Sequence, residues 1–141
     1  MLQAVSTRDP PLVVVVEDDA AVRTALAFAI ELQGFRVATC ASGEDLLKLD
    51  LPAGRSCLVI DQILPGITGL DAIGELRRRG ANAGMILITS HPRPQLRAAA
   101  AVAGVPIIEK PLLGDALISF IRTMLAHELA PRGRAGDGAD A

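Results

Sequence analysis

The sequence predicts a flavodoxin-like α/β fold, a doubly wound (βα)5 parallel sheet with strand order 2-1-3-4-5. Short apolar runs alternate with helical patterns along the chain, which is typical of parallel strands joined by crossover helices. The runs 12–16 and 57–60 are apolar at successive positions, as central strands buried on both faces are. The last run contains Pro106, which lacks an N–H for a sheet ladder and favours an edge position.

Expected strands and expected helices alternate along the chain. The runs expected to be strands are β-branched and bounded by Gly, Pro, Ser or a charge: residues 12–16, 36–40, 56–60, 84–89 and 105–109. The segments expected to be helices lie between and after them: residues 20–33, 43–49, 69–79, 94–103 and 112–129. Ser42 and Thr68 are placed to cap two helix N-termini, and Gly34, Gly80 and Gly104 to end three helices.

Composition limits the function classes. The net charge is −2 and no long Lys/Arg run occurs, so no nucleic-acid surface is expected, and the arginines of residues 75–80 are read as a solvated helix face. No segment is apolar enough to cross a membrane or to act as a secretion signal. Two cysteines inside apolar runs, Cys40 and Cys57, favour thiols in a reducing, cytoplasmic setting.

One domain is expected over residues 12–129. Residues 1–11 are interpreted as a flexible N-terminal segment, and the Gly- and Ala-rich residues 130–141 as a disordered tail.

Polar residues that can bind a metal ion or take part in a reaction lie at the ends of four expected strands. Glu17, Asp18 and Asp19 follow the first strand, Asp61 the third, Lys110 the fifth, and Thr89 ends the fourth. The carboxyl ends of parallel strands meet at one edge of the sheet, where such folds bind ligands. Grouped carboxylates stay ionised only when a cation shares their site. With oxygen ligands and no nearby His or Cys ligand, Mg²⁺ is the predicted ion.

Among the acids, Asp61 is placed as a nucleophile. It opens the loop "DQILPGITG", whose Pro65-Gly66 turn could leave its carboxylate exposed. A carboxylate can attack phosphorus and form an acyl phosphate. Phosphoryl transfer depends mainly on positioning and charge neutralisation, so the metal, Thr89 and Lys110 are expected to bind the phosphoryl oxygens.

Four motifs, "VVEDDAAVR", "LVIDQILPGITGL", "ILITSH" and "IIEKPL", occur in this order within residues 11–128. In these the chain resembles the receiver domain of response regulators in bacterial two-component signalling, nearest to nitrogen-fixation and LuxR-type regulators. The resemblance implies that a histidine kinase or histidine phosphotransfer protein phosphorylates Asp61 in a Mg²⁺-dependent reaction. It implies a signalling phosphoprotein and not an enzyme.

The resemblance also assigns the metal ligands. In the family, an arginine in the first helix lies five residues after the acid that binds the metal directly. If Arg23 is that arginine, the direct ligand is Asp18. Glu17 is then the indirect ligand, and Asp19 is a helix-start residue outside the site. The residue two after the phosphoacceptor gives a backbone carbonyl to the metal, which implies Ile63.

The sequence departs from the family pattern at several positions. Glu17 stands where Asp is usual, and Ile107 where the family places the Tyr or Phe of its switch. Ile63 and His91 lie at positions that tune dephosphorylation in family members. The family's signalling face, formed by the fourth helix, fifth strand and fifth helix, is hypothesised to support a homodimer.

The sequence-based hypothesis is a stand-alone, single-domain response regulator that signals by contact with an unknown target protein. One alternative is a degenerate receiver that binds partners without phosphorylation. Another is a phosphatase of the haloacid-dehalogenase type, but that class needs a second Asp where this chain has Ile63.

Overall fold

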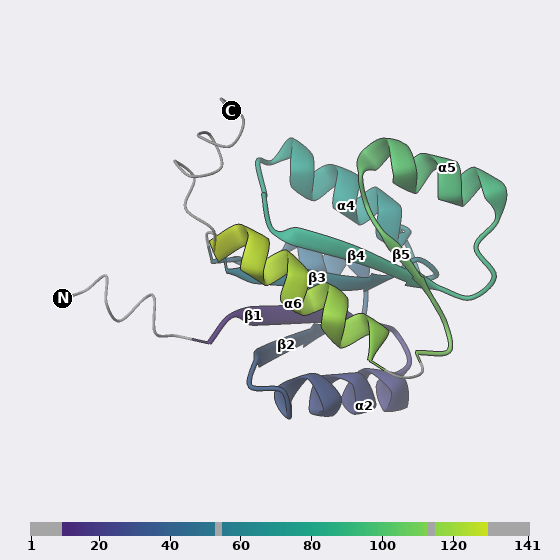
Figure 1. The fold of residues 1–141 in the computed structure, drawn as a ribbon. Helices are drawn as coiled ribbons and strands as arrows, with labels where there is room; N and C mark the ends of the chain where they lie inside the picture. The colour runs from purple at the N-terminus through teal and green to yellow at the C-terminus, as the bar shows by residue number, and fades with distance from the viewer. Residues whose placement is uncertain (1–9, 53–54, 113–114, 130–141) are drawn as a thin grey trace.

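The computed structural model describes residues 10–52, 55–112 and 115–129, so most of the expected flexible N-terminal segment and the whole expected tail lie outside the described residues. The strands are β1 (Leu12–Val16), β2 (Arg36–Cys40), β3 (Ser56–Asp61), β4 (Gly84–Thr89) and β5 (Ile107–Glu109). They form one parallel sheet of order β2-β1-β3-β4-β5 (Figure 1). The predicted fold and strand order are confirmed.

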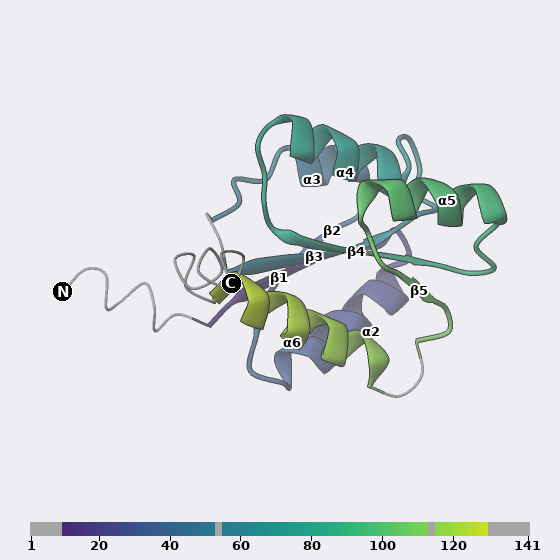
Figure 2. The ribbon, with the colours of Figure 1, turned by 45° about the horizontal axis from the view of Figure 1, so that its top comes forward.

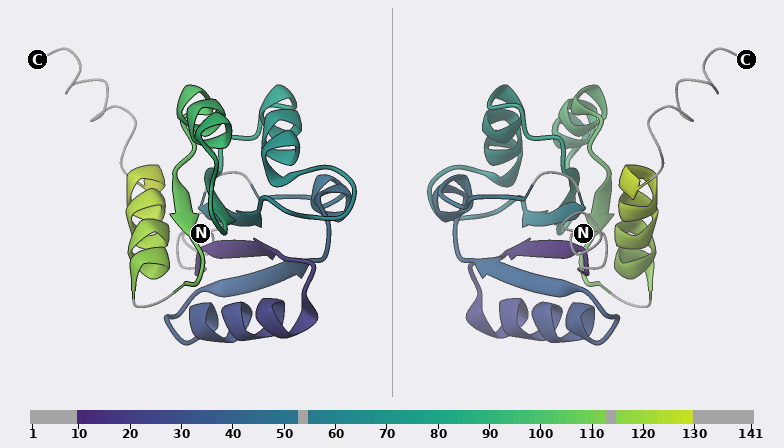
Figure 3. Two further views of the ribbon diagram at one scale, coloured as in Figure 1. Left: turned by 90° about the vertical axis from the view of Figure 1, so that its right-hand side faces the viewer. Right: turned by 90° about the vertical axis from the view of Figure 1, so that its left-hand side faces the viewer.

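Helices cover both faces of the sheet. They are α2 (Ala20–Glu31), α3 (Gly43–Leu47), α4 (Gly69–Arg78), α5 (Pro94–Ala103) and α6 (Ala116–Leu129). Figures 2 and 3 show α2 and α6 on one face and α3, α4 and α5 on the other. No helix in the described part of the chain is long and apolar enough to cross a membrane.

The two-sided cover explains why β1 is apolar at successive positions. Side chains alternate between the faces of a strand. Val14 and Val16 belong to the core on the side of α3, α4 and α5, whereas Val13 and Val15 belong to the core under α2 and α6. All four are completely buried, so neither face of β1 tolerates a polar residue before the strand ends.

The predicted helix N-caps are confirmed by side-chain hydrogen bonds. Ser42 Oγ accepts from the N–H of Asp45 at 3.1 Å, and Thr68 Oγ1 accepts from the N–H of Asp71 at 3.1 Å. Each bond satisfies a donor that the first turn of a helix leaves without a partner. The Thr68 cap matters for the site, because it fixes where the loop after β3 becomes helix.

Several element boundaries differ from the sequence-based expectation. Strand β5 begins at Ile107 and not at residue 105, because the N–H of Val105 bonds to Ala100 O at 2.9 Å and closes the end of α5. Helix α6 begins at Ala116 and not at residue 112, and residues 113–114 lie outside the described residues. Helices α2 and α3 each end two residues early, at Glu31 and Leu47.

The arginines of residues 75–80 lie on an exposed helix face, as the sequence predicted, and two of them also contact neighbouring helices. Arg77 donates to the carbonyl of Ala103 at the end of α5, and Arg79 Nη1 donates to the carbonyl of Leu47 at the end of α3 at 2.7 Å. Cations suit helix C-termini, where carbonyls have no partner within the helix. The end of α4 therefore ties the three helices of this face together.

Candidate functional site

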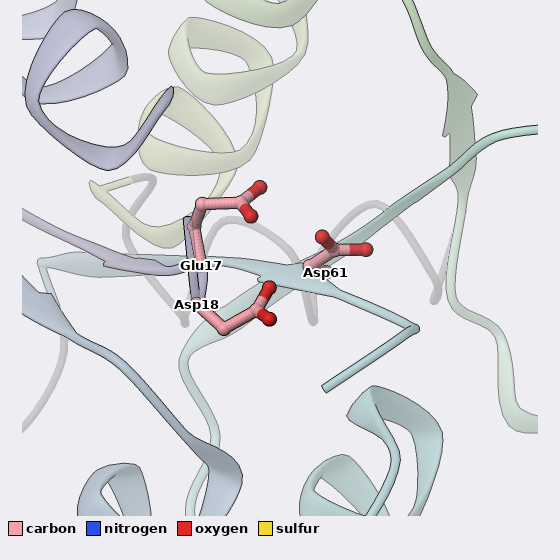
Figure 4. A group of neighbouring side chains, drawn as sticks. All are labelled: Glu17, Asp18 and Asp61. Carbon is pink, nitrogen blue, oxygen red and sulfur yellow. The ribbon is translucent and has the colours of Figure 1, made fainter. Parts of the chain in front are cut away.

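Three carboxylates meet at the carboxyl edge of the sheet, as the sequence predicted. Carboxylate oxygens of Glu17, Asp18 and Asp61 all lie within 4.8 Å of one another. Figure 4 shows the three side chains converging from the end of β1 and the end of β3. These two strands are direct neighbours, with Val16 paired to Ile60, so the residues that follow them arrive side by side.

The three acids differ in their exposure to solvent. Glu17 is 2% exposed and Asp61 is 4% exposed, whereas Asp18 is on the surface. The expectation that the turn after Asp61 leaves its carboxylate exposed was therefore wrong. The cluster combines two buried carboxylates with one that solvent reaches freely. A buried carboxylate loses hydration and needs a compensating partner to remain ionised.

Lys110 supplies part of that compensation. Its Nζ lies 2.8 Å from Asp61 Oδ2 and 3.0 Å from Glu17 Oε1. Burial alone would lower the pKa of Lys110, but the hydrogen bonds from its ammonium to Asp61 and Glu17 outweigh that effect, and its pKa is raised. The ammonium is thus charged throughout the neutral range.

The donor set fits a divalent metal ion. The cluster has three carboxylates and the one ammonium of Lys110, which contacts two of them, so two negative charges remain for a dication to neutralise. Every candidate ligand is a carboxylate or carbonyl oxygen, which suits Mg²⁺. The main chain of Ile63 lies beside the cluster, because its N–H donates to Asp61 Oδ1 at 3.2 Å.

The loop after Asp61 is fixed by residues that the sequence did not single out. Gln62 Oε1 accepts from the N–H of Leu70 at 2.8 Å, and its carbonyl accepts from the N–H of Gly69 at 3.1 Å. Glu44 of α3 accepts from the N–H of Ile67 at 3.0 Å. No sequence spacing signals these contacts, because each depends on how the loop folds back onto α3 and α4.

Thr89 and its neighbours line a pocket beside the loop that follows Asp61. Thr89 is 3% exposed and ends β4, one residue beyond the Asp61–Ile88 pair of the sheet. With Ile63 and His91 it lines a pocket of about 360 Å³. Ile63 is 69% exposed, and His91 adopts a left-handed backbone with φ of 46°.

Ile107, at the position of the family's aromatic switch residue, lies away from the carboxylates. It opens β5, is paired with Leu87 of β4 and is half-buried. The structure therefore joins Glu17, Asp61 and Lys110 by direct contacts and brings Asp18 within 4.8 Å of the two other acids, whereas Ile107 lies on the edge strand.

Lys110→Met should lower the free energy of unfolding by about 2 kcal/mol at neutral pH. It leaves two buried carboxylates without their ammonium, and the loss is below that of a fully buried pair because 23% of the Lys110 side chain is exposed. The raised pKa gives the pH dependence: this stabilisation is complete below the usual pKa of 10.5 and is lost as the pH rises through the higher folded-state value.

Urea unfolding of the wild type and Lys110→Met at neutral and strongly alkaline pH measures this difference. Lys48→Met is the matched control, because Lys48 is an exposed residue at the end of α3. A Lys110 variant as stable as the control variant at neutral pH would show that the ammonium does not stabilise the buried acids.

Fold and site together define a doubly wound α/β protein with an acidic, lysine-bridged centre at the carboxyl edge of its sheet. The chain matches the family model of the response regulator receiver domain over residues 13–122. It therefore belongs to the response regulator receiver domain family, the receiver modules of two-component signalling systems.

Bacterial regulators are among the known proteins that the chain resembles. The transcriptional regulatory protein FixJ of Azorhizobium caulinodans is 37% identical over 124 residues, which cover 87% of this chain and 58% of FixJ. Nodulation protein W of Bradyrhizobium diazoefficiens is 33% identical over 111 residues, covering 78% of this chain and 49% of that protein. The chain thus spans about half the length of these curated relatives.

A solved structure of FixJ-N has a TM-score of 0.77 to this chain at 29% identity. The match covers 87% of this chain and 99% of FixJ-N.

Proposed function

We propose that the chain accepts a phosphoryl group on Asp61 from a histidine kinase or a histidine phosphotransfer protein, in a Mg²⁺-dependent reaction. The observation that carries the proposal is the position of the Asp61 carboxylate, within 4.8 Å of two other carboxylates and 2.8 Å from Lys110 Nζ. This arrangement supports charge neutralisation around a transferred phosphoryl group.

Each residue of the site has a role in the proposed reaction. Asp18, Asp61 and the carbonyl of Ile63 would hold Mg²⁺ directly, and Glu17 indirectly. Bound Mg²⁺ would neutralise negative charge on the phosphoryl oxygens. A carboxylate oxygen of Asp61 forms the new bond to phosphorus while the bond between phosphorus and the donor histidine breaks.

Lys110 and Thr89 would then bind phosphoryl oxygens. The ammonium of Lys110 already contacts Asp61 Oδ2, and the Thr89 hydroxyl lies at the end of the strand next to β3. The Thr89 hydroxyl makes a long contact of 3.4 Å to Ser90 O, so it can exchange that weak bond for a charged acceptor. Ile63 and His91 line a pocket together with Thr89, and we propose that they tune dephosphorylation.

The proposed output is protein contact through α5, β5 and α6, either with an unknown target protein or with a second copy of the chain. Val102 of α5 is 90% exposed and Phe120 of α6 is 39% exposed, and β5 is an edge strand.

Light scattering tests the homodimer: a rise in mass with beryllofluoride and Mg²⁺ is expected. A monomer under both conditions would contradict it.

A degenerate receiver that binds partners without phosphorylation is the second candidate. It is favoured by Ile107, which cannot reproduce the aromatic switch of the family. The phosphatase alternative has less support, because the residue two after Asp61 is the apolar, exposed Ile63 and offers no acid or base.

Intact-mass measurement after incubation with acetyl phosphate tests the proposal. With Mg²⁺, the mass is expected to rise by one phosphoryl group, and with a metal chelator no adduct is expected, because the acids then repel the incoming phosphate. An adduct that forms equally well with the chelator would contradict the Mg²⁺ dependence. No adduct under either condition would favour the degenerate receiver.

A further inference from the structure

Arg23 holds the turn that carries the acidic pair. It lies in the first turn of α2, where its backbone N–H donates to Asp19 O at 2.8 Å. Long side chains in helices point back toward the N-terminus. Accordingly, Arg23 Nη1 donates to the carbonyl of Glu17 at 2.7 Å and makes a longer contact of 3.4 Å to the carbonyl of Asp18.

Other hydrogen bonds fix both sides of this turn but not its centre. The N–H of Glu17 donates to Cys40 O at 3.0 Å, and the N–H of Asp19 donates to Glu17 Oε2 at 3.1 Å. Arg23 acts on the peptide plane between them, whose carbonyl belongs to Glu17. The orientation of that plane sets the direction in which the Asp18 side chain leaves the backbone.

We infer that Arg23 is a positioning residue that keeps the Asp18 carboxylate pointed into the cluster with Glu17 and Asp61. The inference rests on the proposed function, because the geometry it protects is that of the Mg²⁺ site. Groups that orient metal ligands typically change metal affinity by about 10- to 100-fold when they are removed.

The charge of Arg23 and its hydrogen bonds predict opposite effects on Mg²⁺ affinity. A positive charge near the cluster repels Mg²⁺, so by Coulomb's law alone its removal would strengthen binding. Loss of the hydrogen bond to Glu17 O would weaken binding, because Asp18 would no longer be held. Lysine keeps the charge without the planar guanidinium, so Arg23→Lys separates the two effects.

Arg79 provides a matched control. Its Nη1 also donates to a main-chain carbonyl, that of Leu47, and the distance is the same 2.7 Å. It lies at the C-terminal end of α4. This helix starts beside the Asp61 loop at the carboxyl ends of the strands and runs back toward their amino ends. Arg79 variants therefore report the cost of losing such a bond far from the acids.

The experiment compares Lys and Gln variants at positions 23 and 79 in the full chain. Isothermal titration calorimetry gives the Mg²⁺ dissociation constant, since the chain has no Trp or Tyr for fluorescence. Thermal unfolding without Mg²⁺ gives the structural cost. Arg23→Lys and Arg23→Gln should bind Mg²⁺ roughly tenfold more weakly. The Arg79 variants should lower Tm similarly but keep the wild-type dissociation constant.

The outcomes separate this inference from the proposed function. If the wild type binds Mg²⁺ and Arg23→Lys binds it equally well, or Arg23→Gln binds it more tightly, the positioning role is overturned and the proposed function stands. If Arg79 variants weaken Mg²⁺ binding as much as Arg23 variants, the effect is general destabilisation and the inference is also overturned. If the wild type binds no Mg²⁺, the proposed function fails and the role of Arg23 fails with it.

Discussion

Asp18→Ala is expected to abolish Mg²⁺ binding, whereas Asp19→Ala should leave it nearly unchanged. The Asp18 carboxylate lies within 4.8 Å of oxygens of Glu17 and Asp61. The Asp19 carboxylate instead caps α2, accepting from the N–H of Val22 at 3.0 Å. Asp19→Ala should lower the free energy of unfolding by about 1 kcal/mol, because it removes the N-cap of α2.

Calorimetric Mg²⁺ titration of the two variants measures this difference, and urea unfolding supplies the stability comparison. Two adjacent acids of the same size make the pair its own control. Equal losses of Mg²⁺ affinity would show that the direct ligand is misassigned by one residue.

Gly69→Ala is expected to destabilise the fold by about 2–3 kcal/mol and to slow phosphorylation, because overpacking a tight contact displaces backbone. A Cβ at Gly69 would lie 2.4 Å from the backbone oxygen of Asp61 and 2.9 Å from Leu87 Cδ1. The first of these atoms belongs to the backbone of Asp61, the proposed phosphoacceptor, so relief of the clash would move Asp61 itself.

Gly74→Ala in the same helix is the control and should have the opposite sign. A Cβ there meets nothing within 4 Å, and alanine in a helix interior is favoured over glycine by roughly 0.5–1 kcal/mol. Urea unfolding and the rate of adduct formation with acetyl phosphate measure both variants. A Gly69→Ala protein as stable and as reactive as Gly74→Ala would contradict the tight packing of Asp61 against α4.

Sequence patterns were sufficient for the topology and for the residues that meet at the site. The unbroken apolar run of β1 required cover on both faces, and Pro106 indicated an edge, which together favoured the observed order. Glu17, Asp18 and Asp61 could be placed together because the ends of parallel strands meet at one edge of the sheet.

The missed features depend on contacts between segments distant in the sequence. Gln62 and Glu44 hold the loop after Asp61 through backbone N–H groups, which no side-chain pattern encodes. Arg77 and Arg79 contact the ends of neighbouring helices, although their periodicity is that of an exposed face. The start of β5 was misplaced because Val105 completes the end of α5 instead of joining the ladder.

The central claim, that Asp61 carries the phosphoryl group, is tested most directly by intact-mass measurement of the wild type and Asp61→Asn after incubation with acetyl phosphate and Mg²⁺. Asparagine keeps the size of the side chain but has no carboxylate to form an acyl phosphate. The wild type is predicted to gain the mass of one phosphoryl group and Asp61→Asn to gain none. An adduct that persists in Asp61→Asn, or a wild type that forms none, would contradict the claim.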